Sequence, residues 1–264
     1  MQYTASPRWL VSGAPRPSAP QLYCFAHGGG SAAEYLRWAR TIPGAGLHCV
    51  QLPGRGSRAA EELPASLDTL VEAFVAQVPL GPGPFVFLGH SLGALVAYEV
   101  TRRLRDLGAP ALPARLVVSG FPAPHMPRPH TELHTLPDAE LLDAVSRRHG
   151  GIPQEVLDSP ELQALTVPAL RGDYRLLETY VWRESAPLEL PVTVFGGRED
   201  RVTPEQLEAW RELTTGEVTV RRFPGGHFYL RERPAEVLRA LAAEVRAARV
   251  PAGTGGAATE GASC

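Results

Sequence analysis

Short apolar runs alternate with segments of helical spacing between residues 20 and 120, and this alternation restricts the possible folds most strongly. Four runs have the continuous apolar character of buried strands: LYCFAH (22–27), LHCVQL (47–52), PFVFLGH (84–90) and ARLVVSG (114–120). Three segments between them have the spacing of helices: SAAEYLRWARTI (31–42), SLDTLVEAFVAQV (66–78) and LGALVAYEVTRRLRDLG (92–108). Apolar strands that alternate with helices predict an α/β fold, a mainly parallel sheet with helices on both faces.

The pattern changes after residue 120. Two helical segments and no good strand follow, at 136–150 and, interrupted at Pro168, at 161–182. Strand and helix patterns then resume at 191–197, 204–213, 217–222 and 233–249. A helical insertion late in a parallel sheet is typical of a lid over an active site. We therefore expect one α/β domain with four parts: an irregular arm (1–19), a core (20–120 and 188–250), a helical lid (121–187) and a disordered tail (251–264).

The composition excludes several kinds of chemistry. All 26 basic residues are arginine, so neither a Schiff-base lysine nor the lysine of a Walker phosphate loop is present. The net charge is −2 and the arginines are interspersed with acids, which argues against a nucleic-acid partner. We expect no membrane span and no signal peptide, because the chain lacks the apolar stretches that both require. Three cysteines without C-x-x-C spacing favour a cytoplasmic protein.

The motif GHSLG (89–93) lies between an expected strand and an expected helix. This is the context in which a G-x-S-x-G motif forms a nucleophile elbow, with its serine exposed above the sheet on a tight turn. Gly89 and Gly93 supply the small residues that such a turn tolerates. Backbone N–H groups at the start of the following helix can stabilise an oxyanion. The motif therefore predicts that Ser91 is a nucleophile.

A serine nucleophile needs a base and a group that orients the base. In this fold the acid and then the histidine follow the serine, after the carboxyl ends of later strands. His227, in FPGGHFYL, and Asp200, in GGREDRV, fit these places, and Glu199 is the alternative acid. We expect His90 to point away from the serine. We expect the lid carboxylates to be solvated helix charges: Asp143, Asp158 and Asp173.

The first loop, HGGGS (27–31), is suited to supply an oxyanion donor, because its glycines allow close approach of the backbone. We expect the backbone N–H groups of Gly28 and Leu92 to form the oxyanion hole. A phosphate cradle is the weaker alternative, because the G-x-G-x-x-G spacing is absent. The segment HTELH (130–134) differs from the zinc motif H-E-x-x-H, so we expect no metal and no cofactor.

Several segments together resemble one family, the stand-alone type II thioesterases of polyketide and nonribosomal peptide synthesis. The similar segments are FAHGGGSAAEY, QLPGRGSR (51–58), GHSLGALVAYEV, the lid segment 150–180, GGREDRVTPEQLEAW and FPGGHFYL. The lid segment and the L-P-G-R segment together distinguish this family from other esterases, because the elbow motif alone occurs in many of them. Leu92 and Gly28 depart from the family's usual methionine and alanine.

The resemblance implies an α/β-hydrolase fold and hydrolysis of acyl groups from the phosphopantetheine arm of carrier proteins. It also implies a monomer whose partners are acyl-loaded carrier proteins. An esterase or lipase and a non-catalytic receptor with the same fold are the alternatives. Five apolar lid residues are candidates either for an acyl channel or for the lid core: Leu165, Val167, Leu170, Leu176 and Leu177. Arg55, Arg171 and Arg175 are candidates for a carrier-protein docking surface.

Overall fold

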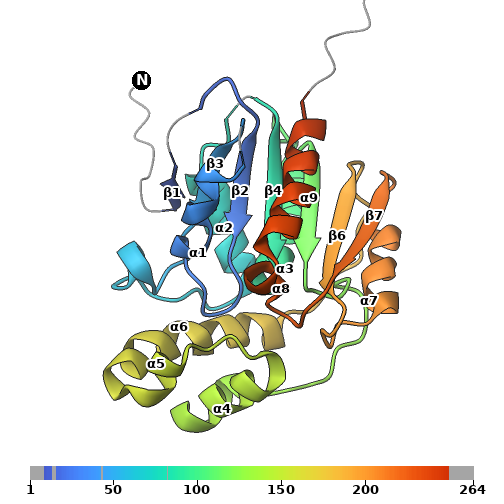
Figure 1. The fold of residues 1–264 in the computed structure, drawn as a ribbon. Coiled ribbons are helices and arrows are strands. Elements are labelled where there is room, and N and C mark those ends of the chain that lie inside the picture. Colours follow the sequence, from blue (N-terminus) through green and yellow to red (C-terminus); the bar gives the residue numbers. More distant parts are fainter. Residues whose placement is uncertain (1–8, 14–15, 43, 82, 250–264) are drawn as a thin grey trace, which may run out of the picture.

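A computed structural model describes residues 9–13, 16–42, 44–81 and 83–249, and Figure 1 shows the fold. Its strands form one seven-stranded sheet in the order β1-β3-β2-β4-β5-β6-β7. Only the pairing of β1 with β3 is antiparallel, and all the other neighbours are parallel. The strand bounds are β1 Leu10–Ser12, β2 Gln21–Phe25, β3 Gly46–Val50, β4 Phe85–His90, β5 Arg115–Ser119, β6 Val192–Gly197 and β7 Val218–Phe223. The predicted α/β class with a mainly parallel sheet is confirmed.

Helices cover both faces of the sheet because the strand residues alternate between two apolar layers. In β4, Phe85 and Phe87 pack with α2 (Leu67–Gln77) and α3 (Leu92–Asp106), whereas Val86 and Leu88 pack on the opposite side. That opposite layer contains α1 (Ala33–Leu36), α8 (Tyr229–Glu232) and α9 (Pro234–Ala247), and α7 (Pro204–Glu208) follows β6. A strand that is buried on both faces has few polar positions, which explains the mainly apolar sequence of β4.

The lid segment, residues 121–187, lies across the carboxyl ends of the parallel strands (Figure 1). It contains α4 (Asp138–His149), α5 (Gln154–Asp158) and α6 (Pro160–Thr179). The predicted interruption at Pro168 is wrong, because α6 continues through this residue. Burial of the neighbours Val167 and Ala169 stabilises the helix against the loss of one backbone hydrogen bond. None of the described helices is long and apolar enough to cross a membrane.

Two expectations near the amino terminus need correction. Residues 10–12 of the predicted irregular arm form the edge strand β1, in which Leu10 pairs with Val50 of β3. The predicted helix 31–42 is a single turn of α1 followed by a 3₁₀ turn, Arg37–Arg40. Its buried side chains are spaced by three residues, Tyr35 and Trp38, and this spacing suits a 3₁₀ turn as well as an α-helix. Residues 1–8 and the tail that we predict to be disordered lie outside the described residues.

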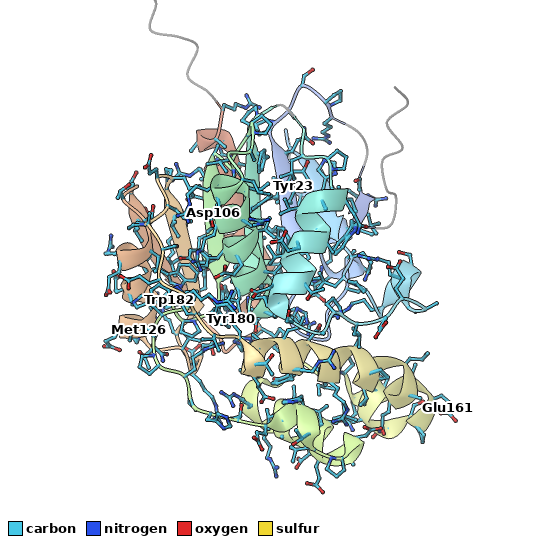
Figure 2. All side chains as sticks on the ribbon, turned by 180° about the vertical axis from the view of Figure 1, so that it is seen from behind. Tyr23, Asp106, Met126, Glu161, Tyr180 and Trp182 are labelled. Atoms are coloured by element: carbon cyan, nitrogen blue, oxygen red, sulfur yellow. The ribbon has the colours of Figure 1, made fainter. Side chains whose placement is uncertain are left out.

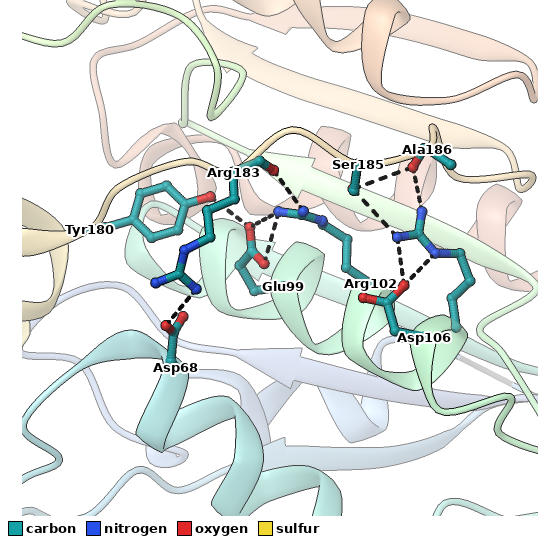
Figure 3. Close-up of polar contacts among 9 residues, drawn as sticks. Asp68, Glu99, Arg102, Asp106, Tyr180, Arg183, Ser185 and Ala186 are labelled. Carbon is teal, nitrogen blue, oxygen red and sulfur yellow. Dashed lines mark hydrogen bonds and ion pairs between the residues drawn. The ribbon is translucent and has the colours of Figure 1, made fainter.

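Polar contacts hold the segment between α6 and β6 against α3 (Figure 3). Tyr180 donates a hydrogen bond to Glu99 over 2.6 Å, and Arg102 donates to the carbonyl of Arg183 over 2.7 Å. Arg105 donates to the carbonyl of Ala186. Because these contacts use buried and half-buried groups of α3, they fix the end of the lid segment to the core.

Candidate active site

Ser91 occupies the tight turn between β4 and α3 with φ 53° and ψ −121°. It is the only non-glycine residue with positive φ in the part of the chain that the structure describes. A Cβ atom on Gly89 would lie 2.0 Å from the carbonyl oxygen of Gly93, and one on Gly93 would lie 2.1 Å from that of Phe25. The two glycines therefore let α3 start directly against β2 and β4. The strained serine with its small neighbours has the geometry of a nucleophile elbow.

His227 and Asp200 form a buried hydrogen-bonded pair near the serine. Nδ1 of His227 lies 2.9 Å from Oδ2 of Asp200, and the two side chains are 5% and 2% exposed. Burial raises the pKa of Asp200, but hydrogen bonds from His227 and from two backbone N–H groups outweigh burial and lower it overall. The ionised carboxylate can only accept, so Nδ1 of His227 carries the proton and Nε2 is left as an acceptor. This is the tautomer that a general base for a serine requires.

The alternative acid, Glu199, is directed elsewhere. Its carboxylate accepts a hydrogen bond from the backbone N–H of Gly225 and has no hydrogen bond to His227. The geometry therefore favours Asp200 over Glu199 as the partner of the imidazole. Ser91 Oγ has no hydrogen-bond partner among the described residues. In enzymes without substrate such catalytic contacts are often long, and they tighten when substrate binds.

The first loop meets the elbow because β2 and β4 are neighbours in the sheet, with Phe25 beside Gly89. The strand order reverses at this pair, which is where open α/β sheets bind ligands. No acceptor is present for the backbone N–H groups of Gly28 and Leu92 within the described ranges. Both groups are thus available for an oxyanion.

A chamber of about 850 Å³ extends from these residues between the core and the lid segment. Ser91, Asp200 and His227 lie in its wall. The rest of the wall is largely apolar and includes Phe121, Pro122, Met126, Leu177, Trp182 and Val202. Of these, Met126 and Trp182, labelled with Tyr180 in Figure 2, lie where the core meets the lid segment. The chamber can hold an extended acyl chain with its carbonyl beside the serine.

Only one of the five candidate channel residues lines the chamber. Leu177 is in its wall, whereas Val167, Leu170 and Leu176 are buried in packed clusters. Leu165 is 75% exposed on the outer side of α6. Val167 and Leu170 therefore belong to the lid core, whereas Leu176 packs in the main core cluster with residues of the sheet and of α3.

Two further histidines, His149 and His90, lie beside His227, and a third, His27, lies beside His90. The ring of His149, at the end of α4, lies 4.4 Å from that of His227, and the ring of His90 lies 5.0 Å away. His90 bonds to Ser119, as expected for a residue that points away from the serine. Burial lowers the pKa of His27 to about 3, with help from the charge of Arg231. Burial and the neighbouring His227 lower the pKa of His149 to about 3, and burial places the pKa of His90 well below its usual value. These rings are neutral near pH 7.

His149, Asp200 and His227 are the one group of described residues whose ligand atoms lie close enough to suggest a metal, within 4.8 Å of one another. The two imidazole rings are tilted by 38° with centroids 4.4 Å apart, and Nδ1 of His227 is already hydrogen bonded to Asp200. In HTELH, His134 is hydrogen bonded to Glu178 over 2.6 Å. Neither arrangement has the donor geometry of a zinc site.

Two expectations about charged residues are wrong. Asp173 is not a solvated helix charge, because it is fully buried and paired with Arg55. Arg55 is 7% exposed and so cannot form a docking surface. Arg171 and Arg175 donate to backbone carbonyls of His134 and Pro64, so both guanidinium groups already have partners within the chain.

Sequence reasoning also misses Arg231. Its guanidinium group binds Glu34 on α1 over 2.9 Å and the carbonyl of Gly151 in the lid segment over 3.0 Å. It also lies 3.2 Å from Nε2 of His27. Arg231 lies on α8, shortly after His227, and therefore connects this part of the chain with the first loop and the lid segment, which are distant in the sequence.

Comparisons with known proteins agree with this architecture. The family model of the thioesterase domain matches residues 20–245. The chain is 36% identical over 248 residues to the gramicidin S biosynthesis protein GrsT of Aneurinibacillus migulanus, covering 92% of this chain and 96% of that protein. It is 38% identical over 234 residues to the thioesterase PikA5 of Streptomyces venezuelae, covering 87% of this chain and 82% of that protein.

Among solved structures, the type II thioesterase BorB from the borrelidin biosynthetic cluster is similar, with a TM-score of 0.81 and 37% identity. That similarity covers 90% of this chain and 98% of the other. The similarity thus extends through the core and the lid segment, and the chain belongs to the thioesterase family of hydrolases.

Proposed function

We propose that this chain is a stand-alone type II thioesterase that hydrolyses acyl groups from the phosphopantetheine arm of carrier proteins. Its role would be the removal of aberrant acyl groups from polyketide or nonribosomal peptide synthases. The observation that carries the proposal is the largely apolar chamber with Ser91 and the His227–Asp200 pair in its wall. The similarity to GrsT and BorB, over nearly the whole of each chain, supports the carrier-protein substrate.

In the proposed mechanism, Ser91 Oγ attacks the thioester carbonyl while Nε2 of His227 takes its proton. Asp200 holds the imidazole in the required tautomer and stabilises its positive charge. The N–H groups of Gly28 and Leu92 receive the oxyanion. The thiol leaves with the proton from His227, which then activates water to hydrolyse the acyl-enzyme.

The proposal includes the arrangement around the chemistry. Residues 121–187 would act as a lid over the core formed by 20–120 and 188–250. The partners would be acyl-loaded carrier proteins, and we propose a monomer that meets them in the cytoplasm without nucleic acid. Arg55 is too buried to contact a carrier protein, whereas the Arg171 side chain is 30% exposed and stays a candidate for the docking surface.

The decisive experiment compares an acyl thioester on a carrier protein with an oxygen ester of the same acyl group. We expect the thioester to have the higher kcat/KM, because a thiol leaves readily and the arm guides the acyl group into the chamber. A marked preference for the oxygen ester would instead indicate a carboxylesterase or lipase. A receptor without catalytic activity would leave both substrates intact and would not react with a serine-directed phosphonate.

A further inference from the structure

The L-P-G-R segment and the lid helix α6 are joined by one buried ion pair. Nη1 and Nη2 of Arg55 bind the two carboxylate oxygens of Asp173 over 2.5 and 2.6 Å. The two side chains are 7% and 1% exposed. Such a bidentate ion pair fixes both the position and the orientation of the two side chains. Replacing one of the two residues leaves a buried charge without a partner.

The same pair also holds the first loop. Oδ2 of Asp173 accepts a hydrogen bond from the backbone N–H of Gly29 over 2.7 Å. Nη1 of Arg55 donates to the carbonyl of Gly30 over 3.1 Å, and the N–H of Gly30 donates to the carbonyl of His27 over 2.9 Å. The peptide groups on both sides of Gly29 are therefore fixed.

The N–H of Gly28, one residue earlier, is left without an acceptor among the residues that the structure covers. A run of three glycines has little stiffness of its own, and Gly29 adopts φ +75°. The direction of the Gly28 N–H thus depends on the contacts of its neighbours. An oxyanion donor has to lie within hydrogen-bond distance of the oxyanion position before reaction, and small displacements weaken catalysis.

We propose that Arg55 and Asp173 are positioning residues of the hydrolytic reaction, which orient the Gly28 N–H toward the oxyanion. Helix α6 is then a component of the catalytic apparatus as well as a cover for the chamber. The inference deepens the proposed function and rests on it for the reaction type. It also gives a physical reason why the L-P-G-R segment and the lid segment occur together in this chain.

The test separates this role from simple folding. The double variant Arg55→Met/Asp173→Leu replaces the pair by apolar side chains, which often maintain stability in place of a buried ion pair. It nevertheless removes the acceptor for Gly29. We expect a melting temperature near that of the wild type but a kcat lower by about 10-fold or more, since loss of one oxyanion donor costs about 10²- to 10³-fold. KM should change by less than about 2-fold, because only transition-state contacts are lost.

Two single variants complete the design. Asp173→Asn keeps an oxygen acceptor for Gly29 and loses the charge, and we expect a smaller fall in kcat. Leu176→Ala is the matched control, because it removes a buried side chain from the same helix outside the chamber wall. This control should lower the melting temperature and leave kcat close to that of the wild type.

A second readout is independent of the natural substrate. The rate at which a fluorophosphonate labels Ser91 also depends on the oxyanion donors, so it should fall with kcat in the double variant. A double variant with wild-type kcat and labelling rate would overturn the inference. So would a kcat that follows the melting temperature through all variants, Leu176→Ala included. If the fluorophosphonate labels wild-type Ser91 but the enzyme does not hydrolyse carrier-protein thioesters, the proposed function is wrong. The labelling rates of the variants then still test whether Arg55 and Asp173 position the oxyanion donor.

Discussion

Replacing Asp200 by asparagine should reverse the tautomer of His227. Oδ2 of the carboxylate lies 2.9 Å from Nδ1 of His227, and the backbone N–H groups of Arg201 and Val202 help His227 to lower the pKa of this carboxyl group. Asparagine has one oxygen, and we expect that oxygen to turn toward the nearby backbone N–H donors. Its NH₂ group then faces Nδ1 over about the 2.9 Å of the present contact, so Nδ1 becomes an acceptor and the proton moves to Nε2. A protonated Nε2 cannot take the proton of Ser91.

The expected loss is large because a protonated Nε2 has no lone pair that could accept the proton of Ser91. We predict that Asp200→Asn lowers kcat by about 10⁴-fold near pH 7, the size of effect that a wrong tautomer produces in a serine triad. Steady-state hydrolysis of an acyl thioester measures it, and circular dichroism checks the fold. Glu199→Gln is the matched control, since its contact is to Gly225, and we expect a change of less than about 10-fold. Equal losses in the two variants, or a larger loss for Glu199→Gln, would refute the reasoning.

Three other perturbations have defined outcomes. Ser91→Ala should abolish acyl-enzyme formation in intact-mass spectra and leave the fold intact; turnover near that of the wild type would mean a different nucleophile. Gly93→Ala should destabilise the protein in urea by about 2 kcal/mol or more, because its Cβ would meet the carbonyl of Phe25 at 2.1 Å, whereas Gly83→Ala, with nothing within 4 Å, should have little effect. The pKa of His27 is about 3 in the folded chain and about 6.5 in the unfolded chain. Between these pH values the unfolded chain binds a proton at this residue and the folded chain does not, so the free energy of unfolding falls as the pH is lowered. From pH 7 to 5.5 the wild type should therefore lose about 1 kcal/mol more than His27→Gln, and equal losses would contradict the burial of a neutral ring.

The core of the fold follows from local patterns. The central strands are buried on both faces, so their sequences are mainly apolar, and the elbow glycines belong to the same short segment as Ser91. His227 and Asp200 are predictable for a similar reason. Both follow the ends of parallel strands, and those ends meet at one edge of the sheet.

The contacts of the lid segment do not follow from local patterns. Arg55 and Asp173 are 118 residues apart, and no spacing rule links them. The sequence nevertheless contains one indication that Asp173 is buried. It lies three residues after Leu170 and three before Leu176, on the buried stripe of α6. A carboxylate on an apolar stripe requires a buried partner. The same periodicity shows why Leu170 and Leu176 pack in the interior and do not line the chamber.

Helix propensity also misleads at Pro168. A proline inside a helix costs roughly 3 kcal/mol relative to alanine, which favours an interruption. In α6 the residues on either side of it are buried, and their packing maintains one continuous helix. Tertiary burial, which the sequence pattern does not quantify, decides the outcome.

In the proposed reaction, Ser91 accepts the acyl group from a carrier-protein arm. The most direct measurement is a single-turnover reaction with an acyl-loaded carrier protein, quenched rapidly and followed by intact-mass spectrometry of both proteins. We predict that the acyl mass leaves the arm, appears transiently on Ser91 and is then released as free acid, and that Ser91→Ala stops the first transfer. Release of the acyl group from the carrier protein by Ser91→Ala at the wild-type rate would contradict it.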